Sequence, residues 1–316
     1  MAFNGLFLDF PAVLGFNSWQ PLLILLPLFL VILLNVKVLP FAWHVRLFYG
    51  YFRHFYFDRR PLPSSSPSGL PTLFQATIYT NKAPLFELDY NLHKSNSTYL
   101  TDLDIARGHH LYCLFREGFH KFNSPNAPPI PIPEQTSSSS SSLKPNARGP
   151  FYPALGGVTC TFKREITPYT PYEIWTRVLS WDTKWVYLIS HFVEKGAGAP
   201  VVFSDQPWRG AERSKSENEA VKARGASKRS VIYASCISKY AFKKGRITVP
   251  PAIFLEACNL LPSVNISEGL EAKDTGTRTV IKAKKEEGMK VAQAMAGLDE
   301  GLEFYSQEEE VVFAKY

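Results

Sequence analysis

The residues with the clearest chemical potential lie in one short segment, Asp89-Tyr-Asn91-Leu-His93-Lys-Ser95-Asn96-Ser-Thr-Tyr99. Asp89 carries a carboxylate that can act as a general base or as a nucleophile. The helical pattern that follows places residues 95–99 at a helix N-terminus, where backbone N–H groups can stabilise an oxyanion. A carboxylate beside such a helix start predicts attack on the carbonyl carbon of an acyl group.

A purely structural interpretation of the same residues stays open. An Asp or Asn beside a helix start often only forms a turn or a cap, and for Asp89 or His93 taken alone this would be the better interpretation. The spacing of the whole segment favours a site role for Asp89. Asn91 and His93 are expected to shape the loop, and Tyr99, one helical step inside, is expected to pack beneath it.

Other residues give no rival site. Four polar residues of the following helix are expected on its surface or in the core rather than as ligands: His109, His110, Asp102 and Asp104. The chain has no Cys/His spacing typical of zinc and no Gly-x-Ser-x-Gly segment. We therefore expect no metal, no cofactor and no α/β-hydrolase site.

Hydrophobic periodicity predicts one long helix among several strands. Apolar residues at spacings of three and four indicate the helix at 98–118, and a shorter helix follows two prolines at 252–261. Strands are predicted at 73–80, 157–166, 172–180, 184–194 and 231–242. One helix among consecutive antiparallel strands predicts an α+β domain with the helix on one sheet face, as in the hot-dog fold, where a sheet wraps around a central helix.

The segment resembles the motif of hot-dog thioesterases of the 4-hydroxybenzoyl-CoA type, Asp-x-Asn-x-His-x-Asn-Asn-x-x-Tyr at the start of the central helix. Five positions match and one departs, since Ser95 stands where the family usually has Asn. More narrowly, the chain is similar to the membrane-anchored thioesterase superfamily member six group and to fungal thioesterase-like proteins. The resemblance covers about residues 72–260.

The resemblance implies a thioester hydrolase in which Asp89 is catalytic. Substrate-binding or loop-shaping roles fall to Asn91, His93, Ser95, Asn96 and Tyr99. It also implies a homodimer that builds an acyl tunnel at its interface. A hot-dog hydratase is disfavoured because its signature resembles Asp-x-Asn-Pro-x-His, whereas here no Pro follows Asn91 and His93 is one position closer to the aspartate.

An apolar segment near the N-terminus predicts a transmembrane anchor. Phe10–Val36 contains no charged residue, and about 20 residues suffice to cross a bilayer. The absence of preceding basic residues and of a small-x-small exit favours a retained anchor over a cleaved signal peptide. The single apolar run predicts a single-pass protein, which we expect in the endoplasmic reticulum membrane. Basic residues follow the run, so the positive-inside rule predicts that the C-terminal domain is in the cytosol.

The aromatic segment Phe41–Phe57 has two interpretations. It can lie in the headgroup zone, with Arg46 and Arg53 meeting lipid phosphates, or it can pack as a helix on the soluble domain. We expect the interfacial arrangement.

The sequence divides into four regions. These are an anchor and interfacial segment at 1–60, a linker at 61–71, a hot-dog domain at 72–262 with disordered insertions at 122–150 and 196–230, and a charged extension at 263–316.

Composition narrows the class of partner. The 316 residues carry a net charge of +7, with 45% hydrophobic and 20% charged residues, which excludes a disordered or multi-span protein. The basic residues are scattered, so we expect no nucleic-acid partner but an anionic membrane face or a CoA-like substrate.

The four widely spaced cysteines are expected to be free buried thiols. The sequons at Asn96 and Asn265 are expected to stay unglycosylated in the cytosol.

Three functions therefore stay open. The first is a membrane-anchored acyl thioesterase that hydrolyses an acyl-CoA or a carrier-bound acyl thioester. The second is a non-catalytic acyl-binding or scaffolding membrane protein, suggested by the Ser95 departure and the two long insertions. The third is release of an acyl chain in secondary-metabolite biosynthesis.

Overall fold

The strands of the domain form one antiparallel sheet. The computed structural model describes residues 20–58, 62, 65, 69–130, 149–196, 231–261 and 271–296. Within them the sheet order is β1-β3-β4-β5-β2, with β6 pairing with β5, and every pairing is antiparallel. The strands are β1 Thr77–Lys82, β2 Phe151–Phe162, β3 Pro171–Trp181, β4 Val186–Glu194, β5 Ile232–Lys244 and β6 Ile247–Val249.

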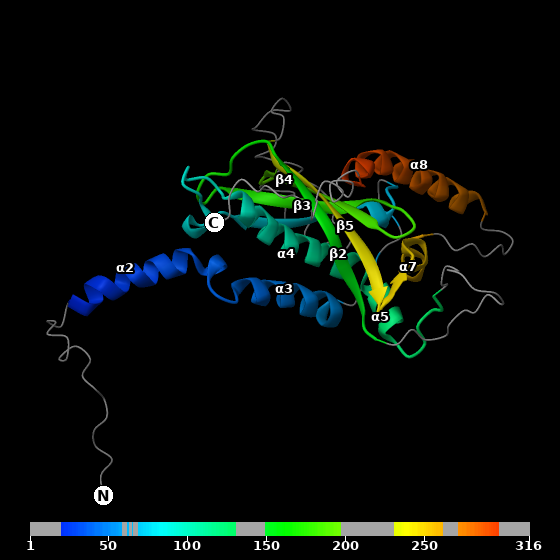
Figure 1. The fold of residues 1–316 in the computed structure, drawn as a ribbon, viewed down its shortest axis with the longest axis horizontal. Helices are drawn as coiled ribbons and strands as arrows, with labels where there is room; N and C mark the ends of the chain where they lie inside the picture. Colours follow the sequence, from blue (N-terminus) through cyan, green and yellow to red (C-terminus); the bar gives the residue numbers. More distant parts are fainter. Residues whose placement is uncertain are drawn as a thin grey trace, which may run out of the picture.

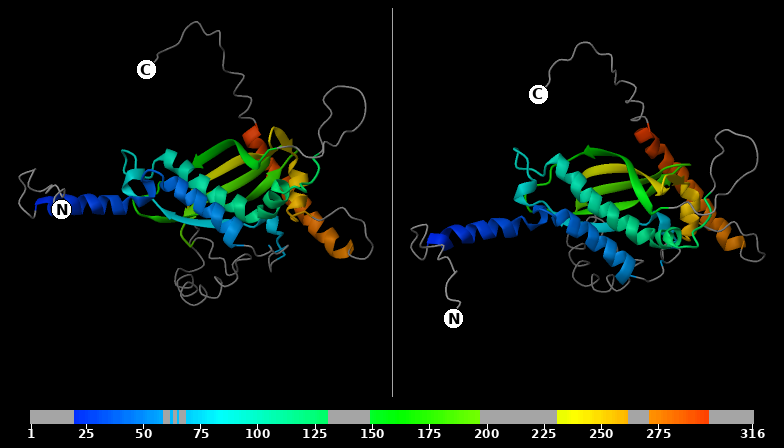
Figure 2. Two further views of the ribbon diagram at one scale, coloured as in Figure 1. Left: turned by 90° about the horizontal axis from the view of Figure 1, so that it is seen from below. Right: turned by 60° about the horizontal axis from the view of Figure 1, so that its bottom comes forward.

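The long helix α4, Asn96–Leu114, runs along one face of this sheet (Figures 1 and 2). Leu103, Ile105 and Ala106 on α4 are almost fully buried. The predicted α+β hot-dog arrangement is therefore present. The helix ends earlier than predicted, because the backbone breaks at Phe115 before α5, Arg116–Asn123, continues the chain.

A cluster of phenylalanines fills the core around α5 and α7, Pro251–Ala257. Phe151 stacks on Phe242 with 5.9 Å between ring centroids, and Phe254 lies 4.0 Å from Phe242. Phe122 is fully buried in the same cluster, and Ile130 is also buried. Residues 122–130, which were predicted to belong to a disordered insertion, are therefore part of the ordered domain. Residues 131–148 of that insertion, and residues 197–230 of the insertion predicted at 196–230, lie outside the described residues.

The N-terminal segment adds a second helical layer outside α4. It comprises α2 Gln20–Leu34, the 3-10 turn η1 Val36–Val38, α3 Ala42–Phe52 and the π-helical turn η2 Arg53–Phe57. Helix α3 lies along α4 (Figure 1) because two glycines permit close approach: a Cβ at Gly50 would lie 3.1 Å from the His109 ring, and one at Gly108 would lie 3.1 Å from Leu47. One face of the predicted interfacial segment therefore packs on the domain.

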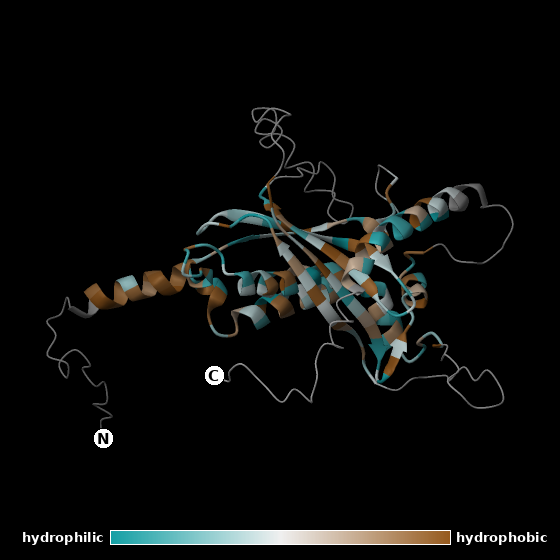
Figure 3. Ribbon diagram, turned by 45° about the horizontal axis from the view of Figure 1, so that its top comes forward, coloured by the Kyte–Doolittle hydropathy of each residue, from teal (hydrophilic) through white to brown (hydrophobic). Residues whose placement is uncertain are grey.

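The predicted transmembrane anchor is not supported. Helix α2 contains no charged residue, is mostly apolar and projects from the domain (Figure 3), but it has 15 residues. None of the helices among the described residues is both long and apolar enough to cross a bilayer. The first part of the predicted span, residues 10–19, lies outside the described residues.

Helix α8, Glu271–Ala296, packs on the opposite face of the sheet from α4 (Figure 1). Gly288 lies directly against the backbone carbonyl of Leu179 in β3. The Ser180 hydroxyl donates a hydrogen bond to the Lys285 carbonyl oxygen at 2.8 Å. Part of the predicted charged extension is thus an ordered layer on the sheet.

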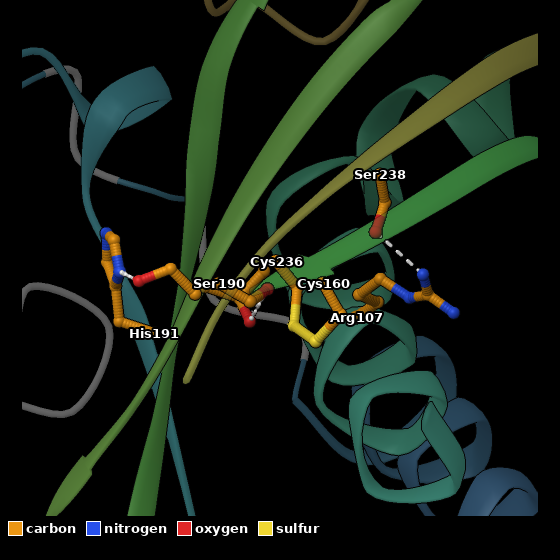
Figure 4. Close-up of a disulfide and its surroundings, with 8 residues drawn as sticks. Arg107, Cys160, Ser190, His191, Cys236 and Ser238 are labelled. Carbon is orange, nitrogen blue, oxygen red and sulfur yellow. Dashed lines mark hydrogen bonds between the residues drawn. A yellow bond between two sulfur atoms is a disulfide. The ribbon is translucent and has the colours of Figure 1, made fainter. Parts of the chain in front are cut away.

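Two of the four cysteines are paired, contrary to the prediction of free thiols. Cys160 on β2 and Cys236 on β5 form a disulfide, with Cα atoms 4.2 Å apart (Figure 4). The antiparallel register of the two strands places them directly opposite each other, although 76 residues separate them in the chain. Cys113 and Cys258 are buried free thiols, as predicted.

Candidate active site

The Asp89 segment forms a tight loop directly before α4. Leu88 and Lys94 form an isolated antiparallel bridge that closes the neck of the loop. Inside it, the Asp89 N–H donates to the His93 carbonyl oxygen at 2.9 Å. Leu92 has a φ of 61°, in the left-handed region, so the loop turns back sharply at that position. The loop therefore has a defined backbone conformation that presents Asp89 near the helix start.

The Asp89 carboxylate helps to hold this loop. Its Oδ1 accepts hydrogen bonds from the N–H groups of Asn91, at 2.9 Å, and His93, at 3.3 Å. This is the turn-forming role that the structural interpretation predicted. Both bonds use Oδ1, so Oδ2 is not needed for the turn. Asp89 and His93 are half-buried, whereas the Asn91 side chain is exposed.

Helix α4 begins immediately after the loop, as the motif predicted. Ser95 is the N-cap residue, and its N–H donates to the Glu87 carbonyl oxygen at 2.8 Å. The Thr98 hydroxyl donates back to the Ser95 carbonyl oxygen at 2.7 Å. Asn96 is the exposed first residue of the helix. The first backbone N–H groups of a helix have no acceptor within it, so this end can bind an anionic oxygen.

Tyr99 packs beneath the loop, as expected. It is 2% exposed, with ring centroids 5.1 Å from Phe162 and 4.9 Å from Phe192. The Lys94 ammonium group lies 5.5 Å above its ring centroid. Burial is the main cause that raises the pKa of the Tyr99 hydroxyl. Tyr99 therefore supports the floor of the loop as a neutral aromatic residue.

A cluster of charged side chains lies directly behind the loop, and the sequence analysis did not predict it. Asp102 on α4 is fully buried, and its carboxylate contacts the ammonium groups of Lys94 and Lys37, each at 2.8 Å. Glu87 contacts the same two ammonium groups, at 2.6 Å from Lys94 and 2.7 Å from Lys37. We call these four residues, Lys37, Glu87, Lys94 and Asp102, the charge ring.

Further polar groups complete the surroundings of Asp102. The Tyr172 hydroxyl donates to it at 2.5 Å, the Asn81 amide at 2.7 Å and the Arg46 guanidinium at 3.0 Å. Burial would raise the pKa of Asp102, but the charges of Lys94 and Lys37 outweigh it and hold that pKa well below its usual range. Asp102 is therefore an ionised carboxylate with several partners inside the protein.

Arg46 corrects one prediction. It was expected to meet lipid phosphates, but its guanidinium points inward to Asp102 and to the Tyr79 hydroxyl, 3.0 Å away. A buried carboxylate attracts a guanidinium more strongly than exposed lipid phosphate can in water, because the low local dielectric strengthens the interaction. The signal that could have revealed this cluster is the position of Asp102, three residues after Tyr99 and therefore on the same buried face of α4.

The remaining polar residues of α4 contact other side chains of the protein. His110 is fully buried, and its Nδ1 lies 3.2 Å from the Thr77 hydroxyl. His109 Nδ1 lies 3.2 Å from His54 Nε2. Asp104 pairs with Arg107, which also donates to the Ser238 hydroxyl at 2.7 Å (Figure 4). Among the described residues, no group of His, Cys, Asp and Glu side chains is arranged to hold a metal ion.

One cavity lies away from the loop. It has a volume of about 400 Å³ and is lined by Tyr49, Phe52, Arg53, Phe57 and Asp58 at the end of α3. Because α3 and α4 run in the same direction, with Arg46 beside Asp102 and Phe55 beside Phe119, this cavity is near the C-terminal half of α4. Asp89 lies at the opposite end of that helix.

Comparison with known proteins agrees with this geometry. The family model of the thioesterase-like superfamily matches residues 84–217, which include the loop, α4 and the strands β2 to β4. Probable thioesterase atnL of Emericella nidulans is 36% identical over 275 residues, 86% of this chain and 83% of that protein. Thioesterase poxG of Penicillium oxalicum is 36% identical over 274 residues, 85% of this chain and 82% of that protein.

Solved structures of lower identity are also similar. The YbaW probable thioesterase from Escherichia coli is 9% identical, with a TM-score of 0.34, and matches 58% of this chain and 96% of its own. The BH1999 gentisyl-coenzyme A thioesterase is 14% identical, with a TM-score of 0.32, and matches 58% of this chain and 99% of its own. The sequence relatives, at 36% identity, are similar to this chain over most of its length and most of their own.

A sheet around a long helix, with a carboxylate loop at the helix N-terminus, defines a hot-dog protein of the thioester-hydrolase class. The chain belongs to the thioesterase-like superfamily. The resemblance predicted from the Asp89–Tyr99 segment is thereby confirmed.

Proposed function

We propose that this protein is a membrane-associated acyl thioesterase in which Asp89 assists the attack of water on an acyl-CoA or carrier-bound acyl thioester. The observation that carries the proposal is the position of the Asp89 carboxylate at the N-terminus of α4 in a member of the thioesterase-like superfamily. The loop holds the Asp89 carboxylate as a base, and the N-terminus of α4, which follows it, offers backbone N–H groups that can bind an oxyanion.

The proposed reaction uses these two features in sequence. Water attacks the thioester carbonyl carbon while Asp89 Oδ2 accepts a proton from it. The resulting oxyanion is held by N–H groups at the start of α4, in the region of Asn96. Collapse of this intermediate breaks the carbon–sulfur bond, and the leaving thiolate is protonated. The products are a carboxylic acid and a free thiol.

The other predicted site residues act around Asp89. The Asn91 and His93 backbones fix the orientation of the carboxylate through Oδ1. Ser95 occupies the N-cap position where the family usually has Asn, and Tyr99 supports the loop from below. Exposed apolar side chains surround the loop, namely Leu85, Phe86, Tyr90, Leu92 and Leu100, and we propose that they receive the acyl chain or a second copy of the protein.

Replacement of the carboxylate tests the mechanism. Asp89→Asn keeps an oxygen that can accept the two loop N–H bonds but removes the base, so kcat on a panel of acyl-CoA substrates is expected to fall by about 10²- to 10⁴-fold. The matched control is Asp182→Asn, since Asp182 Oδ1 also accepts two turn N–H groups, from Lys184 and Trp185, each at 2.7 Å. Full activity in Asp89→Asn would contradict the assignment.

The same assay separates the alternative function. The Oδ1 bonds and Ser95 are also compatible with an acyl-binding protein that does not hydrolyse its ligand. Such a protein would bind acyl-CoA saturably without releasing free thiol. Measured thiol release by the wild-type protein would reject it, and a panel of carrier-bound substrates would show whether acyl release from a biosynthetic carrier is the better description.

A homodimer is part of the proposal. Strand β2 is the edge of the described sheet, and its 12 residues pair only with β5 there. A long edge strand with unpaired N–H and C=O groups is a template for pairing with another chain. Antiparallel pairing of β2 with β2 of a second copy would give a continuous sheet, and light scattering should give the mass of two chains.

Membrane association is also proposed. Every residue of Leu23–Leu26 and Leu28–Leu34 is at least 40% exposed, so α2 is apolar on all sides without cover from the described residues. The outward face of α3 and η2 continues this surface with aromatic and aliphatic side chains, namely Phe41, Val45, Phe48, Tyr49, Phe52, Tyr56 and Phe57. A helix exposed on all its faces suits lipid better than a protein groove, which would cover one face.

The compartment of the domain is the remaining part of the proposal, with the domain in the cytosol beside the endoplasmic reticulum membrane. The basic residues that follow the apolar segment support this orientation. Two features are instead typical of a lumenal domain: Asn96 is exposed in its sequon, and Cys160 is paired with Cys236. Disulfides persist in oxidising compartments. A glycosidase-sensitive sugar on Asn96, together with a disulfide in protein isolated under alkylating conditions, would place the domain in the lumen instead.

A further inference from the structure

The segment that follows α2 contacts the base of the Asp89 loop. Asn35 is fully buried, and its side chain donates to the Val31 carbonyl oxygen at 2.8 Å and accepts the Phe86 N–H at 2.9 Å. Lys37 donates to the Lys82 carbonyl oxygen at 3.0 Å. Residues 35–37 therefore connect the exposed apolar helix to the chain that leads directly into the loop.

The charge ring closes the neck of the same loop. Glu87 precedes Leu88 and Lys94 follows His93, so the two residues flank the loop at its neck. Lys37 and Lys94 each bridge Glu87 and Asp102, which gives an alternating ring of two ammonium and two carboxylate groups. Glu87, Lys94 and Asp102 come from the turn before the loop, the neck of the loop and α4, whereas Lys37 is brought there by the N-terminal segment.

Removal of the Lys37 charge would leave the ring unbalanced. Glu87 and Asp102 would then both depend on Lys94 within the ring, and a buried carboxylate that loses its partner is strongly unfavourable. The two carboxylates would then repel each other. We expect Glu87 to move, because it lies in the short turn η4, Leu85–Glu87, whereas Asp102 is fixed on a long helix. The Glu87 carbonyl also accepts the N–H of the N-cap residue Ser95, so its displacement would move the loop and the helix start together.

Building on the proposed role of Asp89, we propose that Lys37 is a positioning residue for thioester hydrolysis, which holds the neck of the Asp89 loop through Glu87 and Asp102. The N-terminal segment is then part of the active-site scaffold rather than a tether alone. A fragment that begins after residue 60 would lack Lys37 and Arg46 and would have a displaced loop.

Steady-state kinetics of the full-length protein in detergent tests this role. Lys37→Met is expected to lower kcat by about 10- to 100-fold, the effect of a small misplacement of reacting groups, with KM changed less than about threefold. Lys37→Arg keeps the charge and should recover most of the rate. Lys37→Met combined with Glu87→Gln removes the unpaired carboxylate and should also recover part of it. Lys121→Met is the matched control, because Lys121 bonds the Ala257 carbonyl at 2.6 Å far from the loop.

Hydrogen exchange of residues 86–99 measures the same effect without activity. Faster exchange in Lys37→Met than in the wild-type protein and in Lys121→Met supports the part of the proposal in which Lys37 holds the loop, even if the wild-type protein hydrolyses no acyl-CoA and the proposed function is wrong. Unchanged exchange together with unchanged kcat in Lys37→Met would overturn the positioning role and leave the function of Asp89 intact. If Lys37→Met does not fold, Arg46→Met tests the cluster more mildly, since Arg46 contacts Asp102 without touching the ring's other carboxylate.

Discussion

Individual polar residues on the buried side of α4 have distinct electrostatic states. Asp102 is ionised because Lys94 and Lys37 lie against it. His110 is also buried, and this burial lowers its pKa to about 3. An imidazole in that environment stays neutral. The same helix therefore holds one charged and one uncharged titratable group within a few turns.

The state of His110 predicts how stability depends on pH. The unfolded chain binds a proton at His110 near pH 6.5, whereas the folded chain does not until about pH 3. The contribution of neutral His110 to the free energy of unfolding is therefore fully present above about pH 6.5. Below that pH the free energy of unfolding falls by about 1.4 kcal/mol per pH unit for this one proton. Urea unfolding at pH 7, 6 and 5 should show a shallower decline in His110→Gln. The exposed His44→Gln is the control, and equal slopes in wild type and His110→Gln would contradict the prediction.

Glycines at close contacts help to position the helices α3 and α8 against their neighbours. Gly50 and Gly108 allow α3 to approach α4, and Gly288 allows α8 to approach β3. At Gly288 an added Cβ would overlap the Leu179 carbonyl, which is backbone and cannot rotate away. At Gly276 on the same helix, no atom lies within 4 Å of the added Cβ. The two glycines of α8 are therefore a matched pair.

Alanine at these two positions should have opposite effects. Gly276→Ala should stabilise α8 by up to about 1 kcal/mol, because alanine favours a helix more than glycine does. Gly288→Ala should displace α8 from the sheet and lower the melting temperature. Limited proteolysis within residues 271–296 measures the displacement directly. Equal protection of the two variants would show that α8 does not depend on the close approach to Leu179.

The sequence predicted those parts of the structure that depend on local patterns. The Asp89 loop, the start of α4 at Ser95 and the strands β3, β4 and β5 follow from residue type and spacing. The contacts of Lys37 with Glu87 and Asp102 join residues that are 50 and 65 positions apart in the chain. No local hydrophobic periodicity could have predicted them. The Cys160–Cys236 pair depends on strand register, which likewise appears only in the folded sheet.

At the scale of the molecule, the exposed apolar surface of the described residues is distributed asymmetrically. It is concentrated on α2, on the outward face of α3 and around the Asp89 loop. Asn35 and Lys37 connect these regions, because they join the end of α2 to the chain before the loop. If α2 enters a lipid surface, the site is held close to that surface, where acyl thioesters with long chains partition.

Liposome flotation tests this arrangement. The full-length protein should float with vesicles, and a triple variant of α2 with Leu26→Glu, Phe29→Glu and Leu33→Glu should not, because charged side chains are costly in the acyl region. A control with Val280→Glu and Val291→Glu changes apolar positions of α8 that are 40% and 45% exposed. That control should float as the wild type does, and flotation of the α2 variant would exclude α2 as the binding element.

Helix α8 also limits the shapes that an assembly of this protein can take. It lies over β3 on the face of the sheet that α4 leaves open. Its outer side carries both basic and acidic residues, with Lys282, Glu286, Glu287 and Lys290 exposed. Two such sheets cannot stack face to face there, because the helix separates them and its mixed charges favour water. If copies of this protein pair through β2 as proposed, the sheet extends sideways, whereas α8 hinders the stacking of a second sheet on the part of the face that it covers.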